Sequence, residues 1–210
     1  MLSLSGDNLT RLQTLCTDLQ ANVVAVPPFA SAYLQRGHFI HFRCRRADVD
    51  GVRIDVAGHL RGVAPFDQLW ARRQTFDLAG VGAVDVIGLP DLVASKKTQR
   101  DKDWVMIRRL MEVDYFTHRA APAAEQVEFW LRELRTPELL VALASAHDAL
   151  VGALRVQRPL LGAARGGDAE AVEKALAQEM ERERADDRAH WEPLRRELAA
   201  LRKGARGTEG

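Results

Sequence analysis

The chain has 210 residues, of which 47% are hydrophobic and 28% are charged, and its formal net charge is +1. This composition is typical of a folded globular protein and excludes a disordered chain. The balanced charge excludes a broad basic field for nonspecific nucleic-acid binding, so any site for a polyanion would have to be local. Two isolated cysteines, no signal peptide and no apolar run of membrane-spanning length predict a cytoplasmic protein.

The first 118 residues alternate short apolar runs with glycine and proline, and they predict a mixture of strands and helices. Leucines at helical spacing predict a helix over residues 5–19, with Ser5 or Asp7 as its N-cap. The segment 22–28 predicts a short strand that two prolines end. Two longer strands, over 38–44 and 52–58, are expected to pair across a turn at Asp50-Gly51.

A second hairpin and three helices are expected before residue 118. The segment 65–73 predicts a short amphipathic helix, and "QTFDL" and "AVDVIGL" predict two paired strands. One helix should run from Pro90 to Lys97. Another should begin at Asp101 and bury one apolar face.

Residues 119–204 predict a helical region. "TPELLVALASAHDAL" has a cap, a proline at the first helical position and an acid in the first turn, so one helix is expected there. A long charged helix should follow Gly166-Gly167 and kink or split at Pro193. Residues 205–210 are expected to form a disordered tail.

Asp55 is the first candidate for chemistry. In "VRIDV" it shares a strand face with Arg53, while the apolar residues point to the other face. A carboxylate on that face can simply be exposed to solvent, as on many half-exposed antiparallel sheets. It can also be a magnesium ligand that a rigid strand presents.

The second candidate is a cluster of four cations and two carboxylates within residues 96–103. If Lys96 and Arg100 lay on one helix, they would repel each other as an i,i+4 pair. Asp103 can relieve that repulsion internally, or a nucleoside triphosphate can do so. Lys97 and Lys102 complete the cation cluster.

Other patterns carry less weight. His38 and Cys44 should share one face of their strand and His41 should lie on the other, which argues against a zinc site. The sequence contains no Walker loop, nucleophile elbow or dinucleotide fingerprint.

The order of these pieces resembles the later part of the nucleotidyltransferase superfamily, specifically the minimal or AbiEii-like bacterial proteins. The resemblance rests on "VRIDVAGHLRG" followed by "FDQLWARRQTFDLAGVGAVDVIGLPDLVASKKTQRDKDW", and it covers residues 1–116. It implies an α+β fold: a truncated nucleotidyltransferase-like mixed sheet with flanking helices over 1–118, then the all-α region.

The resemblance also implies roles for individual residues. Asp55 corresponds to the third catalytic carboxylate, a Mg²⁺ ligand, and Lys96 or Lys97 to the lysine near the triphosphate of the NTP. Arg100 is expected to bind phosphate, and Lys102-Asp103 corresponds to the terminal motif, with Asp103 supporting the cations. Members of the family transfer a nucleoside monophosphate with two metal ions.

The chain departs from the family pattern at its start. The Gly-Ser turn and the Asp-x-Asp strand, whose acids hold both metals, are absent. Two readings follow: the native start lies upstream of Met1, or this relative has lost part of its site. A lone carboxylate cannot hold two divalent ions, so the chain as written is expected to be inactive.

The alternative function is a non-catalytic interaction module, either toxin–antitoxin-like or a homodimeric scaffold. Its partner or second copy would bind through residues 120–203, whose helices carry many charges on their exposed faces. Nucleic-acid binding without chemistry ranks last, because few aromatic residues accompany the arginines of the first hairpin.

Overall fold

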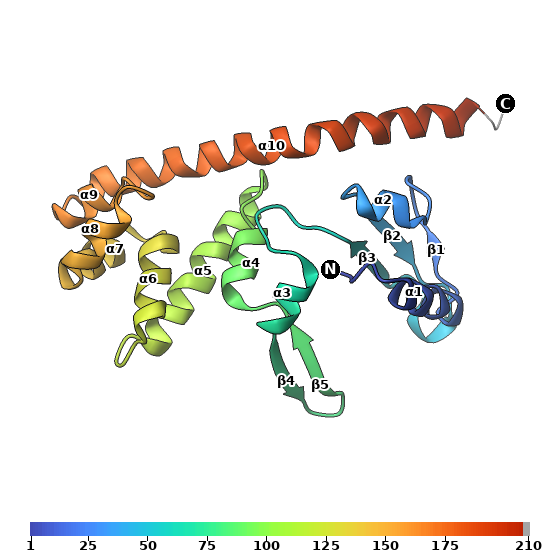
Figure 1. Cartoon of the computed structure of the whole chain (residues 1–210), viewed down its shortest axis with the longest axis horizontal. Coiled ribbons are helices and arrows are strands. Elements are labelled where there is room, and N and C mark those ends of the chain that lie inside the picture. The colour runs from blue at the N-terminus through green and yellow to red at the C-terminus, as the bar shows by residue number, and fades with distance from the viewer. Residues whose placement is uncertain (208–210) are drawn as a thin grey trace. The chain divides into compact units, whose positions relative to one another are not determined.

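The computed structural model describes residues 1–207, and within them the chain forms two compact units. Unit 1 contains residues 1–88 together with the chain from 189 onward, and unit 2 contains residues 89–188. The architecture is α+β, as predicted (Figure 1). The predicted boundary at residue 118 falls inside unit 2, because the helix that ends there packs against the helices that follow it.

Unit 1 is built on a three-stranded antiparallel sheet in the order β1-β2-β3, with β1 at Asn22–Val23, β2 at Phe39–Arg43 and β3 at Arg53–Ala57. The turn between β2 and β3 contains a 3₁₀ helix, η1 (Ala47–Val49), and Gly51 at φ +79°, a conformation that favours glycine. The predicted hairpin is therefore confirmed, and the strand predicted over 22–28 is shorter than expected.

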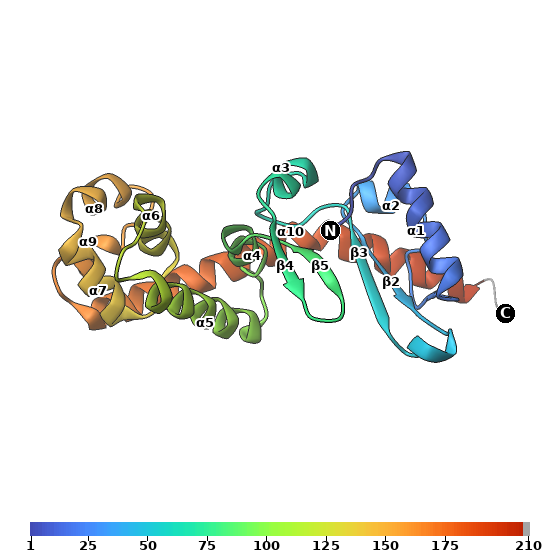
Figure 2. The same ribbon diagram turned by 90° about the horizontal axis from the view of Figure 1, so that it is seen from below.

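One face of this sheet carries the core of unit 1. Helix α1 (Gly6–Asp18) begins at Ser5, whose side chain accepts from the Asn8 backbone N–H, so the predicted N-cap is confirmed. In both views α1 lies along the sheet (Figures 1 and 2). The short helix α2 (Ser31–Gln35) adds Leu34. The buried core residues are Leu12, Cys16, Leu34, Ile40, Phe42 and Val56.

Strand alternation in β2 and β3 agrees with the prediction. His38 and Cys44 are buried with the inward residues, and His41 and Asp55 lie on the opposite face. Both cysteines are free and buried, and burial raises the pKa of the Cys16 thiol. They behave as small apolar residues of the core.

The rest of unit 1 before residue 89 consists of a short helix and a second hairpin. Helix α3 spans Phe66–Ala71, and strands β4 (Gln74–Leu78) and β5 (Gly82–Val86) form a separate two-stranded antiparallel sheet. Both elements were predicted. Gly80 and Gly82 have positive φ and close the turn.

Unit 2 is entirely helical among the described residues. It contains α4 (Leu89–Ser95), α5 (Asp101–His118), α6 (Ala124–Glu133), α7 (Pro137–Ala146), α8 (Asp148–Leu154), α9 (Leu161–Arg165) and the first part of α10 (Ala169–Gly207). Apolar residues from all seven helices form one core around Trp130 and Leu131.

Three helix predictions need correction. The single helix expected over 137–150 is two helices, because the chain bends by 111° at His147. Helix α10 continues through Pro193, so the predicted split at this proline is wrong. Residues 205–207, predicted as part of the tail, belong to α10, and 208–210 lie outside the described residues.

No single helix within residues 1–207 has both the length and the apolar character to cross a membrane. The α7–α8 pair reaches that length only together, and its two halves diverge at His147. Leu140, Leu143 and Val151 from this pair are buried in the core of unit 2.

The end of α10 belongs to unit 1 and is held there by contacts with α2 and β2. Trp191 packs against Phe39, with ring centroids 5.7 Å apart. Glu197 accepts from Arg36 at 2.6 Å and contacts Nε2 of the buried His38 at 2.8 Å. The hydrogen bonds from His38 and Arg36 lower the pKa of Glu197.

Replacing Glu197 with Gln should weaken the attachment of α10 to the sheet of unit 1, because it removes the charge that faces Arg36 and His38. Since the folded pKa of Glu197 is depressed, its contribution is present at neutral pH and is lost as the pH falls through that folded value. The measurement is hydrogen–deuterium exchange at residues 36–43, which should become faster. Glu192→Gln, which affects only an exposed pair with Arg196 within α10, is the control and should leave that exchange unchanged.

Candidate functional site

Asp55 lies in the middle of β3 on the face opposite the core. His41 is its direct partner in the β2–β3 register, and His41 Nδ1 lies 2.7 Å from Asp55 Oδ1. Arg53 Nε donates to the same oxygen at 2.6 Å, and Arg53 Nη2 lies 3.0 Å from His41 Nδ1. The carboxylate is thus fixed on a rigid strand and remains 46% exposed.

The electrostatics keep Asp55 ionised. Burial raises the pKa of this carboxyl group, but the hydrogen bonds and charges of Arg53 and His41 outweigh it, and the pKa is lowered. An ionised, oriented and accessible carboxylate can serve as one ligand of a hard cation such as Mg²⁺. Among residues 1–207, no group of three or more His, Cys, Asp or Glu side chains has the arrangement of a metal site.

The cation cluster lies at the junction of α4 and α5. The helix α4 ends at Ser95 and α5 begins at Asp101, so Lys96 and Arg100 lie in the connecting turn. They therefore do not form an i,i+4 pair on one helix, in agreement with the two separate helices predicted over 90–97 and from Asp101. Trp104 Nε1 donates to the carbonyl oxygen of Thr98 at 2.7 Å and fixes the turn from the core side.

Asp103 is the acid around which this turn is arranged. Its side chain is 2% exposed and accepts from the Thr98 hydroxyl at 2.7 Å, and it forms ion pairs with Arg100 Nε at 3.0 Å and Lys96 Nζ at 3.5 Å. Burial raises the pKa of Asp103, but these three partners outweigh that effect and lower it. Asp103 therefore pairs with both Lys96 and Arg100, and its role as support of a phosphate site stays a prediction.

The other two predicted cations differ from each other. Lys97 Nζ donates to Glu133 Oε1 at 2.9 Å and is largely buried, whereas Lys102 is exposed. Three of the four cations thus have a carboxylate partner within unit 2. A bound phosphate would have to compete with those carboxylates.

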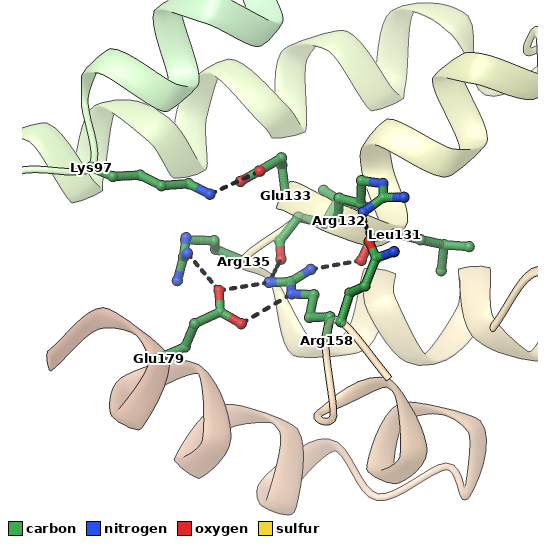
Figure 3. A network of polar contacts seen from close by, with 9 residues as sticks. Lys97, Leu131, Arg132, Glu133, Arg135, Arg158 and Glu179 are labelled. Atoms are coloured by element: carbon green, nitrogen blue, oxygen red, sulfur yellow. Dashed lines mark hydrogen bonds and ion pairs between the residues drawn. The ribbon is translucent and has the colours of Figure 1, made fainter. Parts of the chain in front are cut away.

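Lys97 leads into a network of polar contacts in the interior of unit 2 (Figure 3). Glu179 on α10 accepts from Arg135 at 2.7 Å and from Arg158 at 3.1 Å. Arg158 also donates to the carbonyl oxygens of Leu131 and Leu134, where α6 ends. The network therefore joins the end of α6, the α6–α7 and α8–α9 connections, and α10.

Burial and charge pairing oppose each other in this network. Burial lowers the pKa of Arg135, whose guanidinium also lies 4.4 Å from the centre of the Trp104 ring. Burial raises the pKa of Glu179, but Arg158 and Arg135 outweigh this effect and lower it. Sequence reasoning missed the network, because even directly bonded members such as Arg135 and Glu179 are 44 residues apart and no local pattern connects them.

The structure places the two predicted parts of the site in different units. Asp55 belongs to unit 1, and Lys96, Lys97, Arg100, Lys102 and Asp103 belong to unit 2. Unit 1 also has an open groove of about 620 Å³ between α1 and the sheet, lined by residues that include Gln13, Cys16, Phe29, Phe42 and Arg45. None of the predicted site residues lines this groove.

The predicted partner surface, residues 120–203, exposes little apolar area. Among the large apolar side chains that the structure describes as exposed, only Val156 falls in that range. The others concentrate in α5 and in the β4–β5 hairpin. Binding of a protein partner through 120–203 stays a prediction, and it would have to rely mainly on charged and polar contacts.

Replacing Glu179 with Ala should destabilise the chain by about 3–5 kcal/mol, the usual cost of leaving buried charges without their partner. Because the folded pKa of Glu179 is lowered, the contribution is full at neutral pH and declines as the pH falls through the folded value. Chemical denaturation at pH 7 measures the change. Glu181→Ala, two residues further along α10 with a side chain 59% exposed, should cost less than about 1 kcal/mol. Equal losses in the two variants would contradict a stabilising role for the network.

Comparison of the chain with protein-family models, with curated proteins and with solved structures finds no match. The nucleotidyltransferase resemblance therefore stays a prediction.

Proposed function

We propose that the chain is a nucleotidyltransferase-like protein that supplies one metal-binding carboxylate, Asp55, and a triphosphate-binding cation cluster. Transfer of a nucleoside monophosphate from an NTP to an acceptor would require further carboxylates beside Asp55, because two-metal catalysis needs several anionic ligands. On its own this chain would bind Mg²⁺ and NTP weakly and would not catalyse transfer.

The observation that supports this proposal is the fixed orientation of the Asp55 carboxylate. A solvent-facing aspartate with no function needs no fixed orientation, whereas Asp55 is held by two side chains through a single oxygen, Oδ1. Both of these hydrogen bonds are made by Oδ1, and the side chain is 46% exposed, so the carboxylate is accessible to a cation from solvent. Arg53 and His41 would then act as positioning residues that keep the carboxylate ionised and directed away from the core.

The contacts of the cations favour Lys96 as the phosphate-binding lysine. Its contact with Asp103 is 3.5 Å, longer than the 3.0 Å contact of Arg100, and the lysine can turn outward while Arg100 and Thr98 still satisfy Asp103. Lys97 is less suited to this role, because leaving its contact with Glu133 would uncover a carboxylate that is only 16% exposed. The exposed Lys102 requires no rearrangement.

Replacing Asp55 with Asn should lower the affinity for Mn²⁺ in the presence of ATP by at least about tenfold, because the neutral amide is a poor ligand for a hard cation. Mn²⁺ replaces Mg²⁺ here because electron paramagnetic resonance reports its free and bound fractions directly. Asp48→Asn is the matched control, since Asp48 lies in the nearby turn and pairs only with Arg46. An unchanged Mn²⁺ affinity in Asp55→Asn would remove the metal role.

Replacing Lys96 with Ala should weaken binding of Mg-ATP by about tenfold, the effect expected from loss of one charge-assisted hydrogen bond. Isothermal titration calorimetry gives the affinity, and circular dichroism checks that the helices remain folded. The control is Lys174→Ala, which removes an exposed lysine of α10. If both variants bind Mg-ATP like the unmodified chain, Lys96 does not contact phosphate.

A further inference from the structure

The β4–β5 hairpin has one apolar face and one polar face. In its register Phe76 lies opposite Val84, and Gln74 lies opposite Val86. Because opposed residues share a face and alternate residues switch faces, Phe76, Val84 and Val86 lie together with Leu78. The other face carries Thr75, Asp77, Ala83 and Asp85.

On the polar face, side chains make hydrogen bonds and ion pairs with one another. The Thr75 hydroxyl donates to Asp85 Oδ1 at 2.6 Å, and Arg73 Nε lies 3.0 Å from the same oxygen. These hydrogen bonds, from Thr75 first and Arg73 second, lower the pKa of Asp85. The polar face is therefore suited to contact with water.

The apolar face is uncovered. The exposed fractions are 51% for Phe76, 48% for Leu78 and 37% for Val86, and Val81 at the turn is 74% exposed. A lone two-stranded hairpin is marginally stable in water, because it cannot bury its apolar face. Figures 1 and 2 show no third strand beside β4 or β5, in agreement with the two-stranded topology. A face of this kind normally has a partner.

The strands also lack the features that keep sheets from associating. Natural exposed strands often carry lysine, proline or a charge on the apolar face. Neither "QTFDL" nor "GAVDV" contains Lys, Arg or Pro, and both aspartates of β4 and β5 lie on the polar face. The apolar face therefore meets no charge when it is opposed to a copy of itself.

We propose that a second copy of this chain covers the hairpin, with the two apolar faces packed against each other around a two-fold axis. Apolar residues would then be buried between the hairpins, and Thr75, Asp77 and Asp85 of each copy would face water. The face exposes on the order of a few hundred Å², a typical functional patch. Since a stable interface buries about 800 Å² per partner, the dimer is weak and depends on concentration. The inference is independent of the proposed nucleotide chemistry.

Sedimentation velocity over a range of concentrations tests the proposal on the full chain. The unmodified chain should change from monomer to dimer as its concentration rises. Phe76→Asp should raise the dissociation constant at least about tenfold, because it places a carboxylate between two apolar faces. Asp77→Ala, the adjacent residue on the polar face, should leave the dissociation constant unchanged.

Thiol cross-linking tests the same face without depending on the stability of the Phe76 variant. Val84→Cys, at the centre of the apolar face, should form a disulfide-linked dimer when a mild oxidant such as copper-phenanthroline removes two electrons and two protons from the paired thiols. Ala83→Cys, one residue earlier on the polar face, should not. The unmodified chain should also remain uncrosslinked, since Cys16 and Cys44 are buried.

Three results would overturn the proposal. The chain could remain monomeric at every concentration, which would assign the face to a different partner. It could form a dimer that Phe76→Asp does not weaken, which would move the interface elsewhere, for example to the exposed Val113 and Phe116 of α5. It could form open-ended assemblies, which a closed two-fold contact does not allow.

Discussion

The charge pairing of buried side chains is the constraint on which both units depend. A charge removed from water must find an opposite charge or lose its ionisation, and the cost of leaving it unpaired exceeds most single contacts. Glu179 satisfies this requirement for Arg135 and Arg158, and Arg158 in turn holds the carbonyl groups at the end of α6. In unit 1, Glu197 contacts the buried His38 and the exposed Arg36, so that only one of its partners lies in the interior. Helix α10 supplies both glutamates, so one helix stabilises elements that are far apart in the chain.

The same constraint limits what the cation cluster can do. In the sequence, the cations from Lys96 to Lys102 resemble a phosphate-binding site. In the folded chain, however, Asp103 and Glu133 already pair with most of these cations. A ligand gains only the difference between its own contacts and those that it displaces. Lys96 and Lys102 would give up the weakest internal contacts on binding phosphate. Lys97 would have to leave Glu133 without its lysine partner. The internal pairing therefore does not exclude phosphate binding, but it restricts that role to particular side chains.

Predictions from local sequence patterns were confirmed where the structure is determined by interactions between residues that are close in the sequence. The leucine spacing and Ser5 cap gave α1, and strand alternation gave the opposite faces of His38 and His41. The helix over 137–150 was wrong, because the break at His147 has no proline or glycine to announce it. The domain boundary at 118 and the Glu179 network depend on packing between distant segments, which composition and periodicity do not encode. His41 could have been identified as the partner of Asp55 only with the hairpin register in hand.

The uncovered hairpin and the half-exposed Asp55 are two forms of the same physical situation. Each is ordered by the chain itself, and each remains accessible: an apolar face that is exposed, and a carboxylate that is 46% exposed. An apolar face can be completed by an identical face, because hydrophobic burial is not directional and needs no opposite charge. An anionic oxygen cannot be completed by another anionic oxygen, so a cation must stand between them. Self-association could therefore complete the hairpin but not Asp55, whose half-exposed carboxylate is accessible to water and, under the proposed function, to a metal ion shared with further acids.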